Sequence, residues 1–418
     1  MSMRIGLGLC CLMMMAVGCT DTYNPERNFR TDGQDLELAF LTAEDSSVIE
    51  LPEGHFRFDR SLILDGVHHV TVRGAGIDKT VLSFLDQSEG AEGIRVVNSS
   101  NVDFEGFTVE DAEGDNIKVM DTDGISFLRV KVAWTGPIDE TNGAYGFYPV
   151  QCRNVLIDQC EAMGASDAGI YVGQSDSVII SNNKAYMNVA GIESENSRWV
   201  KIYGNEATDN TGGILIFDLP GLSQYGREIE AYDNVVVENN RKNFAPEGNI
   251  VAAVPPGSGF MILATEDVYV HDNQILENRT VGAAIISYAL VSELTGDNNS
   301  DNSNAGSAQQ INRKYEEDAA YNPYPRGIRL ENNSVSNSYV LPATSHDFGR
   351  LFLLKFPFET PDIVYDGVLP PGISDRQELQ ASEYKICLSE DIETRFADLD
   401  AGKSFEAISH DKSIFACP

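Results

Sequence analysis

Residues able to transfer protons gather around the stretch GAYGFYPVQC, Gly143 to Cys152. Tyr145 carries a phenol, whose unperturbed pKa of about 10 means that it needs electropositive help to act as an acid or base near neutral pH. Lys118, earlier in the chain, is the cation expected to supply that help, and Glu193 is the third candidate catalytic group. These residues are far apart in sequence, so the chemistry depends on elements that bring them together.

A repeat supplies those elements. The phrase AGIYVGQSDSVIISNNKAYMN is followed by GIESENSRWVKIYGNEATDN, and the closing Asn183 and Asn205 lie 22 residues apart. The same alternating strand recurs with its key position at Phe107, Val130, Cys160, Asn183, Asn205, Asn234, Asn273 and Asn333. β-Branched strands punctuated by Gly and Asn predict an all-β solenoid, a parallel β-helix with one rung per unit. Asn at a repeated corner also predicts a ladder of side-chain amides.

The N-terminal residues 1–18 are typical of a signal peptide, because Arg4 precedes an apolar run that is too short to span a bilayer. The run ends in Ala-Val-Gly-Cys19, which resembles a bacterial lipobox and predicts acylation of Cys19. Thr20 follows, rather than the aspartate that retains lipoproteins at the inner membrane. We therefore expect export and anchoring in a bacterial outer membrane, facing the periplasm or the cell surface; ordinary secretion with cleavage nearby is the alternative.

Four segments are expected. Residues 1–18 are the signal peptide, 19–47 a linker and capping helix, 48–356 the β-helix with a loop insertion at 289–326, and 357–418 a C-terminal cap. The helix is predicted at 32–44, with a capping-box spacing from Thr31 to Gln34 and an apolar stripe toward the core. A disulfide between Cys387 and Cys417 is expected to close the cap. Cys152 and Cys160 bracket an extended strand, are too far apart to bond, and are expected to be free.

Alternation along the Gly-Ile strand predicts one functional face. If Ile94, Ile117, Phe147, Ile170, Ile192 and Ile214 point inward, an outward row contains Arg95, Lys118, Tyr148, Tyr171, Glu193 and Leu215. The row is flanked by Asp115, Tyr145, Asp167 and Glu195, and the loop 133–144 with Trp134 and the loop 289–326 with Tyr315, Tyr321 and Tyr324 are expected to line one side. Exposed aromatic rings beside acids suit a pyranose ring and its hydroxyls. The interpretation is a glycan site using Tyr148, Tyr171, Trp134, Asp115, Asp167 and Glu195; the alternative is an ordinary solvated face.

Two resemblances bear on this face. The segments VIELPEGHFRF and HHVTVRGAG resemble the opening rungs of pectate-lyase-like proteins, which implies a right-handed β-helix. Tyr145-Gly146-Phe147-Tyr148-Pro149-Val150 resembles the YGxDPH motif of mannuronan C5-epimerases, in which the Tyr, Asp and His move the C5 proton of a uronate. Here Tyr148 occupies the Asp position and Val150 the His position. The resemblance therefore implies kinship with reduced catalytic capacity. The chain is also similar to exported β-helix-repeat lipoproteins of unassigned function.

Charge limits the partners. Sixty-four acidic and 30 basic residues give a formal charge of −34, which argues against nucleic-acid binding and against a polyanion unless a metal intervenes. The acids Asp111, Glu113, Asp115, Asp121 and Asp123 are a candidate Ca²⁺ cluster, with solvated turns as the alternative. We expect no other metal and no cofactor.

Three functions remain open at this point. The first is a carbohydrate-binding envelope lipoprotein with a catalytically reduced groove. The second is a polysaccharide lyase or epimerase with a rearranged active site. The third is a structural or partner protein of an envelope complex. The expected partners are accordingly a glycan, a membrane through the lipid anchor, and an envelope protein.

Overall fold

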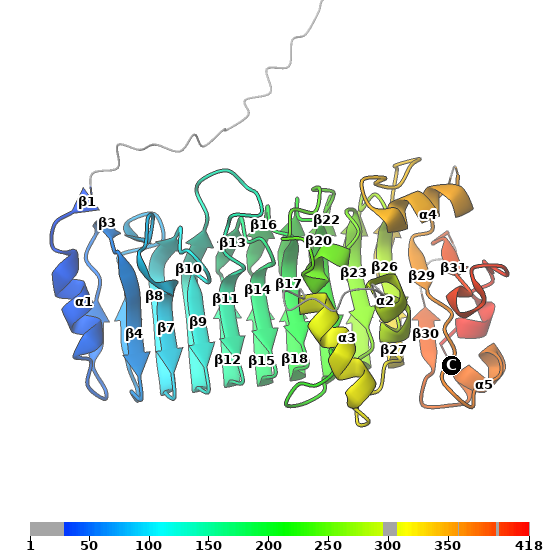
Figure 1. Ribbon diagram of the computed structural model, residues 1–418, viewed down its shortest axis with the longest axis horizontal. Helices are drawn as coiled ribbons and strands as arrows, with labels where there is room; N and C mark the ends of the chain where they lie inside the picture. Colours follow the sequence, from blue (N-terminus) through cyan, green and yellow to red (C-terminus); the bar gives the residue numbers. More distant parts are fainter. Residues whose placement is uncertain (1–28, 296–306, 358, 390–392, 418) are drawn as a thin grey trace, which may run out of the picture.

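The computed structural model describes residues 29–295, 307–357, 359–389 and 393–417. The expected signal peptide and Cys19 lie outside these residues. In the described part of the chain, no helix is both long and apolar enough to cross a membrane. Figure 1 shows a long stack of strands with a helix at one end and short helical segments at the other.

Most rungs of the stack contain three strands, and in two rungs the second and third are joined in one long strand, β8 (Ser100–Glu110) or β10 (Asp123–Ala133). One rung consists of β14 (Ala168–Gly173), β15 (Asp176–Ser181) and β16 (Lys184–Tyr186), and the next of β17 (Ala190–Glu195), β18 (Arg198–Tyr203) and β19 (Glu206–Thr208). Equivalent strands pair in parallel, so that Ile170 lies opposite Ile192. The predicted right-handed parallel β-helix with a 22-residue rung is thereby confirmed.

The first strand of each rung belongs to an 11-stranded sheet. With β14 and β17, this sheet contains β4 (Arg60–Asp65), β7 (Glu89–Val97), β9 (Ile117–Met120), β11 (Tyr145–Val150), β20 (Gly212–Phe217), β23 (Ser258–Leu263), β26 (Val281–Ile286), β29 (Ile363–Tyr365) and β31 (Phe396–Asp398).

The other two sides of the coil form a 20-stranded sheet. With β15, β16, β18 and β19, it contains β1 (Phe29–Arg30), β2 (Val48–Glu50), β3 (Gly54–Arg57), β5 (Thr71–Arg73), β6 (Thr80–Ser83), β8 (Ser100–Glu110), β10 (Asp123–Ala133), β12 (Arg153–Asp158), β13 (Glu161–Met163), β21 (Arg227–Tyr232), β22 (Val235–Val237), β24 (Glu266–His271), β25 (Gln274–Leu276), β27 (Arg326–Glu331), β28 (Ser334–Ser336) and β30 (Ile386–Ser389).

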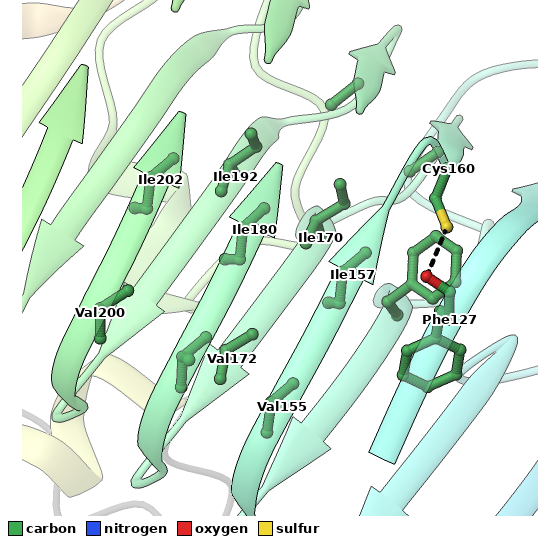
Figure 2. Close-up of a cluster of buried hydrophobic side chains, with 14 of the residues drawn as sticks. Phe127, Val155, Ile157, Cys160, Ile170, Val172, Ile180, Ile192, Val200 and Ile202 are labelled. Carbon is green, nitrogen blue, oxygen red and sulfur yellow. Dashed lines mark hydrogen bonds between the residues drawn. The ribbon is translucent and has the colours of Figure 1, made fainter. Parts of the chain in front are cut away.

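The core consists of columns of apolar side chains that point into the coil. All six residues predicted to point inward from the Gly-Ile strands are fully buried. Figure 2 shows Ile170 and Ile192 on successive rungs, with Val155, Ile157 and Val200 on the adjoining side of the coil. The glycine before Ile192 is required by space, since a Cβ on Gly191 would lie 2.6 Å from the carbonyl oxygen of Gly213.

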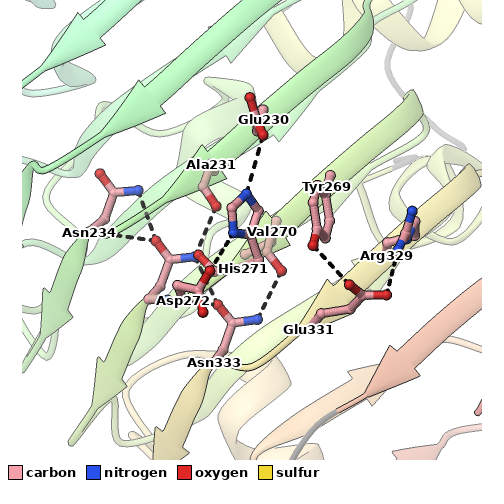
Figure 3. A network of polar contacts seen from close by, with 11 residues as sticks. Glu230, Ala231, Asn234, Tyr269, Val270, His271, Asp272, Arg329, Glu331 and Asn333 are labelled. Atoms are coloured by element: carbon pink, nitrogen blue, oxygen red, sulfur yellow. Dashed lines mark hydrogen bonds and ion pairs between the residues drawn. The ribbon is translucent and has the colours of Figure 1, made fainter. Parts of the chain in front are cut away.

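Asparagine side chains form the predicted ladder at one corner. The Asn205 Nδ2 donates to Asn234 Oδ1 at 3.0 Å, and Asn273 Nδ2 donates to Asn333 Oδ1 at 2.8 Å. Figure 3 shows Asn234 and Asn333, two members of this ladder. Cys160 continues the column, buried as predicted, with its amide donating to Asn183. A second ladder of Asn188, Asn210, Asn239 and Asn278 runs along the next corner and was not predicted, although its members lie five residues after those of the first.

Helix α1 (Gly33–Leu41) covers the N-terminal end, with Leu36 and Phe40 buried against the first rungs. It is shorter than the predicted 32–44. The predicted capping box is wrong, because Asp32 is the N-cap residue and makes no side-chain capping bond.

The C-terminal region differs from the expected separate cap. Strands β29, β30 and β31 continue both sheets past residue 356, because Ile363, Ile386 and Phe396 supply buried side chains in register with the rungs before them. Helix α4 (Asp347–Lys355), helix α5 (Arg376–Gln380) and the 3₁₀ turns η2 (Ala401–Lys403) and η3 (Ser413–Phe415) cover this end. The expected disulfide joins Cys387 to Cys417, and Cys152 and Cys160 are free.

The expected loop 289–326 is largely helical where the structure describes it. It contains the end of helix α2 (Tyr288–Thr295) and the whole of helix α3 (Ser307–Glu317), which lies in front of the strands in Figure 1. The segment 296–306 lies outside the described residues.

Candidate functional site

The strands of the 11-stranded sheet place the predicted outward row on one face. Arg95 lies opposite Lys118, and Lys118 opposite Tyr148. Tyr171 lies opposite Glu193, which in turn lies opposite Leu215. Residues up to 120 positions apart in the chain, from Arg95 on β7 to Leu215 on β20, therefore lie on one face of the same sheet.

Three tyrosine rings make contact in the middle of this row. The ring centroids of Tyr145 and Tyr148 are 4.4 Å apart, and each lies within 5 Å of Tyr171, at 4.8 and 4.9 Å. Tyr171 is only 4% exposed, whereas Tyr145 and Tyr148 are half-buried. The partly accessible rings of Tyr145 and Tyr148 therefore pack against the buried ring of Tyr171.

Buried carboxyl groups accompany these rings. The Tyr145 hydroxyl donates to Asp167 Oδ2 at 3.0 Å, and the Tyr171 hydroxyl donates to Glu195. Glu193 is 2% exposed and forms no hydrogen bond or ion pair with any residue that the structure describes. We call these six residues the tyrosine–carboxyl site: Tyr145, Tyr148, Tyr171, Asp167, Glu193 and Glu195.

Burial keeps the acids of the site protonated to unusually high pH. Removal from water raises the pKa of Asp167 and of Glu195 to about 7 each, while the tyrosine hydrogen bonds oppose the rise. The pKa of Glu193 is raised well above its ordinary value by burial and by the neighbouring Asp167 and Glu195. Carboxyl groups that exchange protons near neutral pH are typical of functional sites.

The tyrosines act as hydrogen-bond donors here. Burial and the nearby acids raise the pKa of Tyr145 and of Tyr171 well above its ordinary value. The expectation that Lys118 assists Tyr145 stays a prediction; the Lys118 ammonium lies over the ring of the neighbouring Tyr148, 4.7 Å from its centroid. Lys118 is also held by Asp115 at 3.3 Å and Glu92 at 3.7 Å. Asp115 therefore serves as a partner of Lys118 in this structure.

Two expectations about exposed aromatics are wrong. Trp134 is 4% exposed, and its indole nitrogen donates to the Ala112 carbonyl, since the loop folds back onto the coil. Tyr321 is buried, donates to the Asp218 carbonyl at 2.7 Å, and packs edge-on against Tyr315. These rings fasten insertions to the β-helix.

The candidate Ca²⁺ cluster is dispersed. Asp111 accepts hydrogen bonds from Thr135, Asp115 pairs with Lys118, and Asp123 accepts from Asn154. Among the described residues, the one group of three side chains with metal-ligand spacing is Glu331 with Cys387 and Cys417, whose two sulfurs are joined in the disulfide.

Sequence reasoning missed a segment that covers the site. Residues 238–257, which include the 3₁₀ turn η1 (Ile250–Ala253), place Val251 and Val254 against Tyr171 and Leu215, with Phe244 packed beside them. The sequence did contain one sign of this insertion, because the interval between Asn234 and Asn273 is longer than the 22-residue repeat. On the other side, α3 brings Lys314 close enough to Glu195 for its charge to oppose the rise in that pKa.

Phe244 and Ala245 also line a cleft of about 710 Å³. Its other lining residues come from the loop after β10 and from the corner after β19, and are Ile138, Asp139, Glu140, Thr141, Asp209, Asn240, Arg241, Lys242 and Asn243. The cleft thus adjoins the tyrosine–carboxyl site.

Comparison with known proteins agrees with this architecture. Residues 61–222 match the family model described as "Right handed beta helix region", and the strand pairing extends the same coil well beyond them. The chain is therefore a right-handed parallel β-helix protein. It is similar to the A-module of the Azotobacter vinelandii mannuronan C-5 epimerase AlgE6, with 14% identity, a TM-score of 0.50, and coverage of 89% of this chain and 92% of that one.

Two further similarities concern the same coil. The A-module of the A. vinelandii mannuronan C-5 epimerase AlgE4 has 16% identity and a TM-score of 0.49, covering 87% of this chain and 92% of that one. The pre-neck appendage protein of Bacillus phage B103 is 23% identical over 254 residues, which is 52% of this chain. The match spans 28% of the length of that phage protein.

Proposed function

We propose that this protein is an exported envelope lipoprotein that binds carbohydrate at the tyrosine–carboxyl site. The observation that carries the proposal is the contact of three tyrosine rings beside three buried carboxyl groups on one face of the coil. Half-buried rings offer an apolar surface to a pyranose, while carboxyl groups accept or donate hydrogen bonds to its hydroxyls. The proteins named as epimerases that share the fold add support for a glycan as ligand.

The charges of the site favour a neutral sugar. The nearby cation Lys118 is already held by Asp115 and Glu92. Ionisation of Asp167 and Glu195, whose pKa values are about 7, would add negative charge beside a uronate carboxylate. Proton removal next to a carboxylate also needs a cation or acid that stabilises the developing enediolate. For this reason we regard the site as reduced in uronate chemistry.

One observation favours a catalytic alternative. Asp167 and Glu195 have pKa values of about 7, which suits proton donation and acceptance at neutral pH. A lyase or epimerase with a rearranged active site would use these carboxyls together with their tyrosine partners. This alternative requires a turnover product, whereas simple binding does not.

A glycan array with the soluble form lacking residues 1–19 tests the proposal, followed by product analysis on the glycans that bind. Selective binding without product is the expected result. New reducing ends or unsaturated uronates would instead support the catalytic alternative. Failure to bind any glycan, with no product, would overturn the carbohydrate proposal and favour a structural or partner role.

The anchor has a separate test. We propose that Cys19 is acylated and holds the protein in the outer membrane, on the basis of the apolar run and the Ala-Val-Gly-Cys sequence. Cys19→Ala should move the protein from the membrane fraction to the soluble fraction. A variant that stays with the membrane would contradict lipid attachment at this residue.

A further inference from the structure

Two insertions form a cleft next to the tyrosine–carboxyl site. Residues 134–144 lie between β10 and β11, and residues 238–257 lie between β22 and β23. Both therefore leave the coil at the same corner, where the third strand of one rung leads to the first strand of the next. The cleft between them has a volume of about 710 Å³, which is within the range of small-molecule sites.

Hydrogen bonds hold both walls of this cleft. On one wall, the Arg241 guanidinium donates to the Asp209 carboxylate at 2.6 Å, and the Asn243 amide donates to the carbonyls of Val251 and Val254 at 3.0 Å. On the other wall, Asn142 donates to the Gly164 carbonyl at 2.7 Å. A cleft with fixed walls loses little conformational entropy when a ligand enters.

The lining combines one aromatic ring with polar groups of both signs. Phe244 lines the cleft and packs against the cluster that contains Tyr145, Tyr148 and Tyr171. Lys242 is exposed and forms no ion pair with any described residue. Asp139 and Glu140 lie on the facing loop. An anionic ligand would meet these acids, whereas a neutral pyranose can donate its hydroxyls to them and accept from Lys242.

We propose that this cleft is a second sugar subsite, occupied by a neutral pyranose unit of the same glycan chain that reaches the tyrosine–carboxyl site. Phe244 supplies the stacking surface, and Lys242 supplies a hydrogen-bond donor. The proposal rests on the carbohydrate function proposed above, and it adds that the ligand extends across two subsites. Affinity should therefore increase with chain length.

Titration of the full-length protein in detergent with neutral oligosaccharides tests this inference. The probes are the disaccharides and hexasaccharides of the β-1,4-glucan, β-1,4-mannan and β-1,4-xylan series. For a series that binds, Phe244→Ala should weaken hexasaccharide binding by about tenfold, and it should weaken disaccharide binding less, because Phe244 also packs on the cluster that contains Tyr148. Lys242→Ala, an exposed change with little effect on folding, should weaken the hexasaccharide by about threefold.

Trp199→Ala is the matched control, because Trp199 is 44% exposed on β18 in the other sheet; it should leave both affinities unchanged. If hexasaccharide binding survives in both cleft variants but falls in Tyr148→Ala, the second subsite is overturned and the carbohydrate function stands. Equal weakening of both chain lengths by Lys242→Ala would also overturn the second subsite. If the parent binds no probe, the inference fails, and the array decides separately on the proposed function.

Discussion

The asparagine corner and the tyrosine–carboxyl site both bury polar side chains, but the site leaves one of them, Glu193, without a hydrogen bond to the described residues. Asn205 accepts from the backbone and amide of Asn183 and donates to Ile180 and Asn234. Glu193 is equally buried and forms no comparable bond with the described residues. Buried polar groups that are fully bonded support a fold, whereas unpaired ones cost free energy. The difference supports the proposal that the corner serves stability and that the carboxyl cluster serves binding.

The largest effect is expected at the corner. Asn205→Ala removes four hydrogen bonds and leaves their partners buried, so it should lower the free energy of unfolding by about 3 kcal/mol. Urea unfolding followed by circular dichroism measures the loss. Glu206→Gln, an exposed change at the next residue, is the control and should alter stability by less than about 0.5 kcal/mol. Equal effects of the two variants would break the contrast.

The carboxyl site should respond in the opposite direction. The folded protein retains the Glu195 proton up to a pKa of about 7, whereas the unfolded chain releases it near the ordinary value of 4.5. The parent therefore loses stability as pH rises between these values. Glu195→Gln should be more stable than the parent by about 2–3 kcal/mol at pH 8, and the gain should vanish below about pH 4.5.

Unfolding of the parent and Glu195→Gln across this pH range provides the measurement. Glu140→Gln, a change on the exposed loop 133–144, should follow the parent at every pH. A Glu195→Gln variant that is less stable than the parent at pH 8 would show that the ionised carboxylate stabilises the fold.

A smaller effect is expected from removing the single hydrogen bond between Tyr171 and Glu195. The Tyr171 hydroxyl donates to Glu195 and lowers its pKa against the effect of burial. Tyr171→Phe should therefore raise the pKa of Glu195 by about one unit, which is about 1.4 kcal/mol. Carbon-13 NMR titration of the glutamate carboxyls follows this change. An unchanged or lower pKa would mean that the two groups are not paired.

The smallest effect on stability is expected for a substitution of Cys160 in the asparagine corner. Cys160 stands in the ladder column, where its backbone amide donates to Asn183 and its thiol lies 3.5 Å from the Phe127 carbonyl oxygen. Cys160→Asn should extend the ladder by one rung and change stability by less than about 1 kcal/mol, whereas Cys160→Leu should destabilise by more. Thermal unfolding compares the two variants. Equal destabilisation would indicate that the ladder ends at Asn183 for steric reasons.

The regular part of this molecule was predictable because its contacts repeat. Ile170 and Ile192 lie in one column because the 22-residue repeat in the sequence is also the length of one rung. The same strand register places Lys118 and Glu193 in one outward row. The insertions were not predictable in this way. Trp134 was expected to be exposed and is buried, and Phe244 packs on the same cluster as Tyr148 from a loop almost 100 residues away in sequence. Such contacts depend on how each inserted loop folds back onto the coil. The repeat in the sequence does not predict the conformation of these loops.

Isothermal titration of a glycan selected on the array tests the central claim most directly, using the parent, Tyr148→Ala and Trp199→Ala. Tyr148 and Trp199 are both partly accessible aromatic residues on strands, but only Tyr148 belongs to the tyrosine–carboxyl site. If this face binds glycan, Tyr148→Ala weakens binding by about tenfold and Trp199→Ala leaves it unchanged. Unchanged binding in Tyr148→Ala, or a loss confined to Trp199→Ala, would contradict the assignment of glycan binding to this face.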